Sequence, residues 1–346
     1  KLGAELQPLR AALEHLAYDA HTRQGDVPEH DDVPADIPEN EVLAVLSKHL
    51  PGNINARDAV PYLKHRAGLL LERRPAVYAF PHRSFQEYLA ACYLAETERD
   101  FGKALRDRIW EDATWWREVF LLGVGKAKRG VLSNAVGVIN TLVPSELVDV
   151  PDPTPIHWRA ASLAGEALLD LDLQEKGGER PHHQALLRRV RRWLAALVEG
   201  GQLSPRERVT AGDSLGRLGD PRPGVGIRTV NGVDLPDILW VEIHGGTFLM
   251  GSAEGDSEAY DDEQPQHELT VPPYYIARYP VTNAQFRPFV EGGGYGNPAY
   301  WTEQGWAWRQ GAEPDMSPWD DYSDKDFVEQ IREWIARRPK EKRDCP

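Results

Sequence analysis

The stretch Tyr78-Ala-Phe-Pro-His-Arg-Ser-Phe-Gln-Glu-Tyr-Leu-Ala-Ala-Cys-Tyr-Leu94 joins a strand pattern directly to a helix pattern. Val77, Tyr78 and Phe80 have high strand propensity. Pro81 interrupts strand pairing and suits the first turn of a helix. Apolar residues then recur at helical spacing, which predicts the buried face of that helix. These residues are Phe85, Tyr88, Leu89, Cys92 and Tyr93.

The residues before this stretch predict helices followed by a strand–turn–strand unit. We expect a helix over 1–24, an acidic proline-bearing linker over 25–37, and a second helix that begins near Pro38. Asp58 is the predicted cap of a third helix, and 69–80 read as two short strands around a turn. This order of elements is typical of a winged helix.

The segment Phe80-Pro-His-Arg-Ser-Phe-Gln-Glu-Tyr-Leu-Ala-Ala91 resembles the F-x-H-x-S-F-Q-E-Y-L-A-A signature of NACHT-type (STAND) signal-transduction ATPases. The resemblance implies the end of a winged-helix region that follows a nucleotide-binding core outside this chain. That core would bind ATP or ADP with Mg²⁺. His82 is then a candidate sensor of the nucleotide state, with His65 a second possibility. The competing interpretation of His82 is a histidine packed at a turn.

Residues 101–226 predict a helical array. Ser204, Pro205 and Glu207 have the spacing of a capping box, and Gly219 is expected to end that helix. The phrase Ala211-Gly-Asp-Ser-Leu-Gly-Arg-Leu-Gly-Asp-Pro-Arg222 resembles a HEAT-like repeat. A preceding helix is predicted over 182–198, and its expected buried residues are Leu186, Leu187, Val190, Trp193, Leu194 and Leu197. Its arginines are expected on a solvated face: Arg188, Arg189, Arg191 and Arg192.

The composition changes after about Asp234, where Gly, Pro, Trp and Tyr become frequent and long helical patterns stop. The run Trp240-Val-Glu-Ile-His-Gly-Gly-Thr-Phe-Leu-Met-Gly-Ser252 alternates around a Gly-Gly pair and predicts a β-hairpin. An acidic loop spans Glu254 to Glu263. Its carboxylates suit Ca²⁺, but they lack the spacing of an EF-hand, so we favour a solvated loop.

Three phrases in this region resemble the formylglycine-generating enzymes and their sulfoxide-synthase relatives. They are Trp240 to Ser252, Asp262-Glu-Gln-Pro-Gln-His-Glu-Leu269 and Pro280-Val-Thr-Asn-Ala-Gln-Phe286. The resemblance implies an irregular C-type-lectin-like fold. In that family a cysteine pair binds copper, or histidines of a partner domain hold iron. No cysteine lies between Trp240 and Asp344, and the H-x-x-x-E-x-H spacing is absent, so we carry over no catalytic residue and no metal ligand.

Tryptophans are frequent near the end of the chain. Trp301, Trp306 and Trp308 are candidate ligand-binding residues, because aromatic rings can stack on a sugar or peptide. Aromatic residues in a loop-rich fold also serve as core, which is the competing interpretation.

Composition narrows the function classes for this chain of 346 residues. A net charge of −14 argues against a general nucleic-acid binder, because phosphate neutralisation needs a basic surface. No apolar run is long enough for a transmembrane helix, and the two cysteines fit a reducing compartment, so we expect a cytoplasmic protein. The pattern at both ends suggests a fragment of a longer chain.

Together these patterns predict a multidomain chain that is mostly α, with a winged helix (1–100) and a HEAT-like helical array (101–226). An incomplete α+β C-type-lectin-like FGE-sulfatase module (235–346) follows. The expected function is the regulatory and sensor portion of a NACHT-type ATPase. It would recognise an unknown protein or small molecule and oligomerise on activation. The alternative is an oxidoreductase of the formylglycine-generating or sulfoxide-synthase type, with its catalytic residues beyond this chain. A passive binding scaffold is the third possibility.

Overall fold

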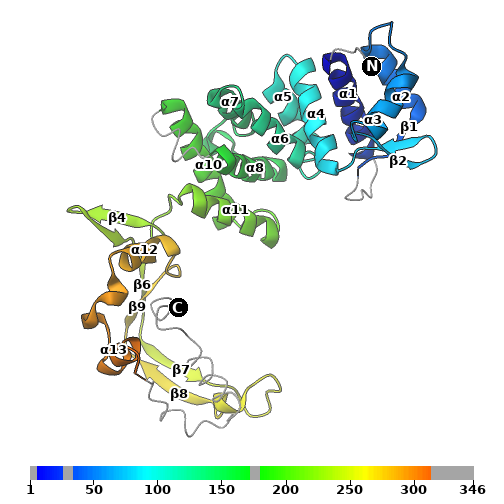
Figure 1. Ribbon diagram of the computed structural model, residues 1–346. Helices are drawn as coiled ribbons and strands as arrows, with labels where there is room; N and C mark the ends of the chain where they lie inside the picture. The colour runs from blue at the N-terminus through cyan, green and yellow to red at the C-terminus, as the bar shows by residue number, and fades with distance from the viewer. Residues whose placement is uncertain (1–5, 26–33, 172–179, 313–346) are drawn as a thin grey trace. The chain divides into compact units, whose positions relative to one another are not determined.

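The computed structural model describes residues 6–25, 34–171 and 180–312 (Figure 1). The chain divides into two compact units, Lys1–Pro221 and Arg222–Pro346. Twelve α-helices lie in the described ranges, ten of them in the first unit. The coarse prediction of a mostly helical part followed by a smaller part that contains strands is confirmed. The assignments to a winged helix, HEAT-like repeats and a C-type-lectin fold, and the limits of the three domains, stay predictions.

The first part of the helical unit combines four helices with a small antiparallel sheet. The elements are α1 (Leu6–Gly25), β1 (Ile37–Pro38), α2 (Glu39–His49), α3 (Ala56–His65), β2 (Leu71–Arg74), β3 (Val77–Ala79) and α4 (Arg83–Thr97). The strand order is β1-β3-β2, with Ile37 opposite Tyr78. Asn55, and not Asp58, caps α3, because its side chain accepts a hydrogen bond from the backbone N–H of Arg57.

The buried face of α4 differs from the predicted one. Phe85 is 44% exposed, whereas Gln86 and Glu87 are buried. The cause is the packing of α1 along this side of α4. The Gln86 side-chain oxygen accepts a hydrogen bond from the backbone N–H of Ala35 at 2.9 Å, and Glu87 pairs with Arg83 at 2.9 Å. Polar residues therefore take part in a face for which helical periodicity predicts only apolar residues.

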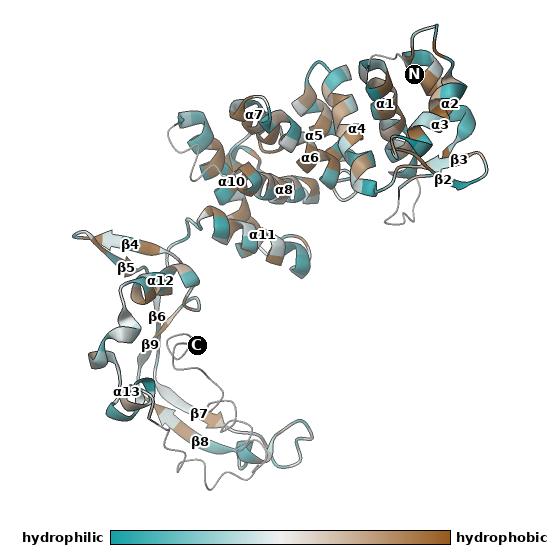
Figure 2. Ribbon diagram, viewed as in Figure 1, coloured by the Kyte–Doolittle hydropathy of each residue, from teal (hydrophilic) through white to brown (hydrophobic). Residues whose placement is uncertain are grey.

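Six further helices lie in the described part of this unit: α5 (Phe101–Glu111), α6 (Arg117–Lys128), α7 (Leu132–Leu142), α8 (Pro155–Leu171), α10 (Pro181–Glu199) and α11 (Pro205–Leu218). A short 3₁₀ turn, η1 (Leu147–Asp149), lies between α7 and α8. α6 packs on α7, α7 on α8, and α8 on both α10 and α11. One hydrophobic core extends from Ala90 to Leu218, and Figure 2 shows hydrophobic residues along these helices.

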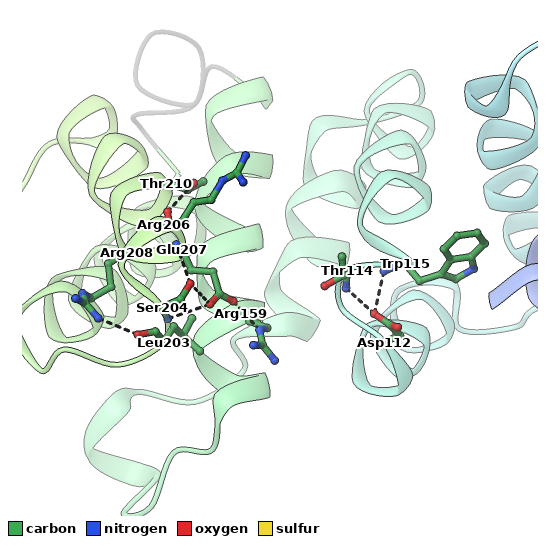
Figure 3. Close-up of polar contacts among 10 residues, drawn as sticks. All are labelled: Asp112, Thr114, Trp115, Arg159, Leu203, Ser204, Arg206, Glu207, Arg208 and Thr210. Carbon is green, nitrogen blue, oxygen red and sulfur yellow. Dashed lines mark hydrogen bonds and ion pairs between the residues drawn. The ribbon is translucent and has the colours of Figure 1, made fainter. Parts of the chain in front are cut away.

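Helix starts in the array follow local side-chain chemistry. Ser204 and Glu207 form the predicted capping box at α11, and Figure 3 shows Glu207 beside Ser204 and Arg159. Asp112 accepts hydrogen bonds from the backbone N–H groups of Thr114 and Trp115 in the turn before α6 (Figure 3). These caps satisfy amide groups that a helix start leaves unpaired.

The arginines of α10 are only partly on a solvated face. Arg188 and Arg192 are exposed as predicted, but Arg189 and Arg191 are half-buried. Arg189 donates to the carbonyl oxygens of Val143 and Pro144, and Arg191 donates to that of Leu218. These two side chains tie α10 to the segment after α7 and to the end of α11. The predicted inward residues of α10, from Leu186 to Leu197, are buried.

Between residues 222 and 312, the second unit is built from short strands and two helices. They are β4 (Ile227–Val230), β5 (Val233–Pro236), β6 (Trp240–Ile243), β7 (Gly246–Met250), β8 (His267–Val271), β9 (Tyr274–Ala277), α12 (Asn283–Glu291) and α13 (Glu303–Arg309). Three 3₁₀ turns accompany them: η2 (Asp261–Glu263), η3 (Gly294–Gly296) and η4 (Pro298–Tyr300). β4 and β5 form a hairpin whose turn, Asn231–Gly232, has φ values of 52° and 79°. Such positive values at both positions define the Asn-Gly turns that join hairpin strands.

The predicted hairpin around Gly245 and Gly246 does not form. β6 pairs with β9 and β7 pairs with β8, all antiparallel. Ile243 lies opposite Tyr274 and Gly246 opposite Val271, so the register continues from one pair to the other. The two pairs are one ribbon, interrupted where Gly245 meets the prolines 272–273. Proline has no backbone N–H to donate, which explains the interruption.

Candidate functional site

The start of α12 is a polar site that joins several segments of the second unit. Thr282 caps the helix and forms a capping box with Gln285, whose side chain is buried. The Gln285 amide donates to the carbonyl oxygens of Gly224, at 3.1 Å, and Asp237, at 2.5 Å. The Thr282 hydroxyl donates to the carbonyl oxygen of Val225 at 2.8 Å. One helix start therefore holds both ends of the segment that contains the β4–β5 hairpin.

Aromatic rings follow this site along α12 and the segment after it. The ring centroids of Phe286 and Phe289 are 5.3 Å apart, and those of Phe289 and Tyr295 are 5.2 Å apart. Trp301 lies 6.4 Å from Tyr295 and 6.3 Å from Trp306. These separations are typical of interacting aromatic pairs. The Trp301 indole also donates to the carbonyl oxygen of Tyr295 at 3.0 Å.

The structure brings together two of the three predicted ligand-binding tryptophans. Trp301 and Trp306 belong to the run of rings, and both are half-buried. Trp308 is half-buried on α13, two positions after Trp306. Residues two positions apart on a helix do not face each other, so Trp308 does not share the face of Trp306. A ligand-binding role for the three residues stays a prediction.

His82, the predicted nucleotide sensor, lies at the start of α4. It is the N-cap residue of that helix, its side chain makes no capping hydrogen bond, and it is exposed. Its ring centroid lies 6.4 Å from that of Phe85. This geometry fits a residue at a turn, and the nucleotide-sensing role stays a prediction.

The described residues do not provide a donor set for copper or iron. Within 6–25, 34–171 and 180–312, no group of three or more His, Cys, Asp or Glu residues could hold a metal ion. Cys92 is buried on α4, and burial raises the pKa of its thiol. Cys345 lies outside the described residues. We therefore derive no reaction step through a metal.

Sequence reasoning missed Gln285, although a signal was present. Thr282 and Gln285 have the T-x-x-Q spacing of a capping box. This spacing predicts the hydrogen bonds within the box. It does not predict the bonds to Gly224 and Asp237, which depend on long-range packing.

A family model matches residues of this second unit, and several curated proteins match parts of the chain. Residues 230–330 match the family model described as the sulfatase-modifying factor enzyme 1-like domain. The chain is 42% identical over 73 residues to a hercynine oxygenase of Mycolicibacterium smegmatis, which is 21% of this chain and 17% of that protein. It is 46% identical over 55 residues to a formylglycine-generating enzyme of Mycobacterium tuberculosis, which is 16% of this chain and 17% of the relative.

Catalytically silent relatives match as well. The chain is 46% identical over 54 residues to the mouse protein named inactive C-alpha-formylglycine-generating enzyme 2, which is 16% of this chain and 17% of the relative. The chain thus spans less than a fifth of the length of these curated relatives.

These relatives correct the predicted function. The expectation of a regulatory and sensor portion of a NACHT-type ATPase is wrong, because the relatives are named hercynine oxygenase and formylglycine-generating enzyme. They favour the alternative, an oxidoreductase. The predicted use of ATP or ADP with Mg²⁺, the unidentified partner and the oligomerisation are tested by none of these findings and stay predictions. In the described part of the chain, no helix is both long and apolar enough to span a bilayer.

Proposed function

We propose that the second unit is part of an oxidoreductase module of the sulfatase-modifying-factor class. The reacting residues would lie outside the described ones. The observation that carries this proposal is the family match over 230–330, together with 42% identity to a hercynine oxygenase. Identity at this level over a short segment supports a shared local fold. Activity resides in a site, so it needs its own test.

Within this proposal the described residues build and orient the module. Thr282 and Gln285 fix α12 against the segments that flank the β4–β5 hairpin. The fixed helix then supports the run of aromatic rings from Phe286 to Trp306. Trp301 and Trp306 are half-buried, so part of each ring is available to a ligand. We assign them to one wall of the substrate site.

The test is oxygen consumption by the natural protein that contains this chain. One assay uses copper with a peptide substrate that contains a cysteine. The other uses Fe(II) with hercynine and a thiol. We expect oxygen uptake that depends on one of these substrates, with the oxidised product identified by mass spectrometry. If neither mixture consumes oxygen above the level of the metal and substrate alone, the oxidoreductase proposal is wrong.

A second candidate is a catalytically silent binding module. The match to a relative named inactive C-alpha-formylglycine-generating enzyme 2 favours it, because the shared segment is compatible with loss of activity. Binding of the cysteine peptide or of hercynine without turnover would support this candidate. Calorimetry on the same protein preparation separates the two outcomes.

A further inference from the structure

The helical unit contains a cavity that lies outside the residues matched by the family model, 230–330. It has a volume of about 240 Å³ and is lined by residues of α5, α8, α10, the end of α7 and the segment after it. Three aromatic side chains contribute to its wall: Trp110, His157 and Trp193. Pockets for drug-sized ligands are larger than this, at roughly 300 Å³ or more. The volume suits a single ring with a short substituent.

The rings of these three residues lie in two orientations. His157 and Trp193 are nearly parallel, with an interplanar angle of 12° and centroids 6.4 Å apart. Trp110 meets His157 edge-on, at 81° and 6.0 Å. Trp193 is buried, and its indole N–H donates to the carbonyl oxygen of Ser145 at 3.1 Å. Its polar atom is therefore satisfied, and its ring offers an apolar surface to the cavity.

Trp110 differs from the other tryptophans of the helical unit. It is 37% exposed, whereas Trp115, Trp116, Trp158 and Trp193 are each at most 6% exposed. Those four side chains are part of the core. Contact between a large aromatic ring and water is unfavourable. A ligand that covers Trp110 would therefore be stabilised by removing this apolar surface from water.

Two hydrogen bonds from Thr154 hold the ring of His157 in place. The backbone N–H of Thr154 donates to its Nδ1 atom at 3.2 Å, and the Thr154 hydroxyl lies 2.8 Å from the same atom. Because a backbone N–H can only donate, Nδ1 is the acceptor and the proton lies on Nε2. His157 thus adds a hydrogen-bond donor, its Nε2–H group, to the site.

Arg106 provides the charge at the cavity. Its guanidinium carbon lies 5.8 Å from the centre of the Trp110 ring, and its Nε and Nη2 atoms donate to Asp107. Within the described part of the chain, Nη1 has no hydrogen-bond partner. Among the described residues that line the cavity, Arg106 is the charged one. The lining therefore favours a neutral or anionic ligand over a cation.

We propose that this cavity binds a small planar aromatic carboxylate. The ring of the ligand lies against Trp110 and Trp193, and its carboxylate accepts hydrogen bonds from Arg106. Stacking on the tryptophan rings favours a planar aromatic ring in the ligand. The positive guanidinium of Arg106 favours a negative charge on the ligand. This site is independent of the function proposed for the second unit.

The test compares three probes of similar size by calorimetry on the whole chain. Phenylacetate has both the ring and the charge, cyclohexylacetate lacks the aromatic plane, and phenylacetamide lacks the charge. We expect phenylacetate to bind with a Kd of about 1 mM or tighter and at least about tenfold more tightly than either analogue. No binding of phenylacetate in this range, or equal affinity for all three probes, would overturn the proposal.

Two variants test the residues that define the ligand. Trp110→Leu should weaken phenylacetate binding about tenfold and reduce the preference over cyclohexylacetate. Arg106→Gln should weaken it to the level of phenylacetamide. Arg206→Gln is the matched control, because Arg206 is exposed on α11 and does not line the cavity. Circular dichroism checks that each variant is folded. Wild-type affinity in both folded cavity variants would contradict the proposed site.

Discussion

The Gln285 side-chain amide lies 3.1 Å from the carbonyl oxygen of Gly224, a residue 61 positions earlier in the chain. Gly224 in turn donates its N–H to the Asp237 carboxylate at 2.8 Å, and it has a φ value of +90°, which favours glycine. An added Cβ at Gly224 would lie 2.7 Å from that of Leu239. The contact therefore needs the side-chain amide of Gln285 as the donor and a glycine, which has no Cβ, at position 224.

Replacing the buried amide should destabilise the second unit. Gln285→Ala leaves the carbonyl oxygens of Gly224 and Asp237 without their donor, so we expect a loss of about 2 kcal/mol in the free energy of unfolding. Hydrogen exchange over residues 222–312 reports this loss locally. Gln304→Ala is the control, because Gln304 is exposed in the first turn of α13. Equal protection in the two variants would contradict a structural role for the amide.

Two adjacent glycines should respond differently to the same substitution. A Cβ at Gly245 would lie 2.6 Å from the carbonyl oxygen of Val271 and 2.7 Å from the nitrogen of Pro273, both of them backbone atoms. A Cβ at Gly246 meets nothing within 4 Å. We expect Gly245→Ala to cost about 1–3 kcal/mol and Gly246→Ala to be nearly neutral. Urea unfolding of both variants gives the difference, and similar midpoints would exclude a close approach at Gly245.

Local patterns predicted the helices well, because helical periodicity and caps depend on neighbouring residues. Examples are the buried face of α10 from Leu186 to Leu197 and the capping box of Ser204 and Glu207. The predicted face of α4 was wrong at Phe85, because the position of α1 decides which side is covered. The predicted Gly245–Gly246 hairpin was wrong because each strand pairs with a distant strand, and alternation does not identify the partner.

The candidate site could be predicted only in part. The phrase from Pro280 to Phe286 resembles the family whose model matches residues 230–330, but it did not show that Gln285 reaches Gly224 and Asp237. Trp301 and Trp306 were predicted together and do interact. The short NACHT-like phrase around His82 favoured the wrong function. Such a phrase indicates a strand–turn–helix conformation, and proteins with many different activities can contain that conformation.

The capping box of α11 should make stability depend on acid pH. Hydrogen bonds from Ser204 and Arg159 lower the pKa of Glu207 from 4.5 to about 2. As the pH falls, Glu207 is therefore protonated at a higher pH in the unfolded chain than in the folded chain. The contribution of ionised Glu207 to the free energy of unfolding is complete above pH 4.5 and is lost as the pH falls toward about 2. Glu207 is 35% exposed, so solvent screens its ion pair and we expect this contribution to be only about 0.5–1 kcal/mol.

Glu207→Gln should remove this part of the pH dependence. Urea midpoints of the wild type and the variant should converge as the pH approaches about 2, and they should differ most above pH 4.5. Glu199→Gln provides a comparison at another exposed glutamate of the same unit. A constant difference between the wild type and Glu207→Gln at every pH would show that the box contributes nothing through the charge.

A second pH dependence should come from a histidine pair between α1 and α2. His15 Nδ1 lies 3.0 Å from His49 Nε2, and His15 Nε2 lies 3.2 Å from an Asp19 carboxylate oxygen. Tyr93 stacks on His15 with centroids 5.1 Å apart. Burial, followed by the charges of His15 and Lys48, lowers the pKa of His49 from 6.5. Protonation of His49 is thus harder in the folded chain than in the unfolded one.

The stability from neutral His49 is present above pH 6.5 and is lost as the pH falls below that value toward the folded pKa. We therefore expect the wild type to lose stability in this range and His49→Asn to lose less, because the variant has no proton to take up there. His15 keeps Asp19 in the variant, so the difference isolates His49. His65→Asn, at an exposed histidine of the same unit, should follow the wild-type profile. Thermal unfolding between neutral pH and pH 5 measures all three proteins, and parallel profiles for the wild type and His49→Asn would contradict the coupling.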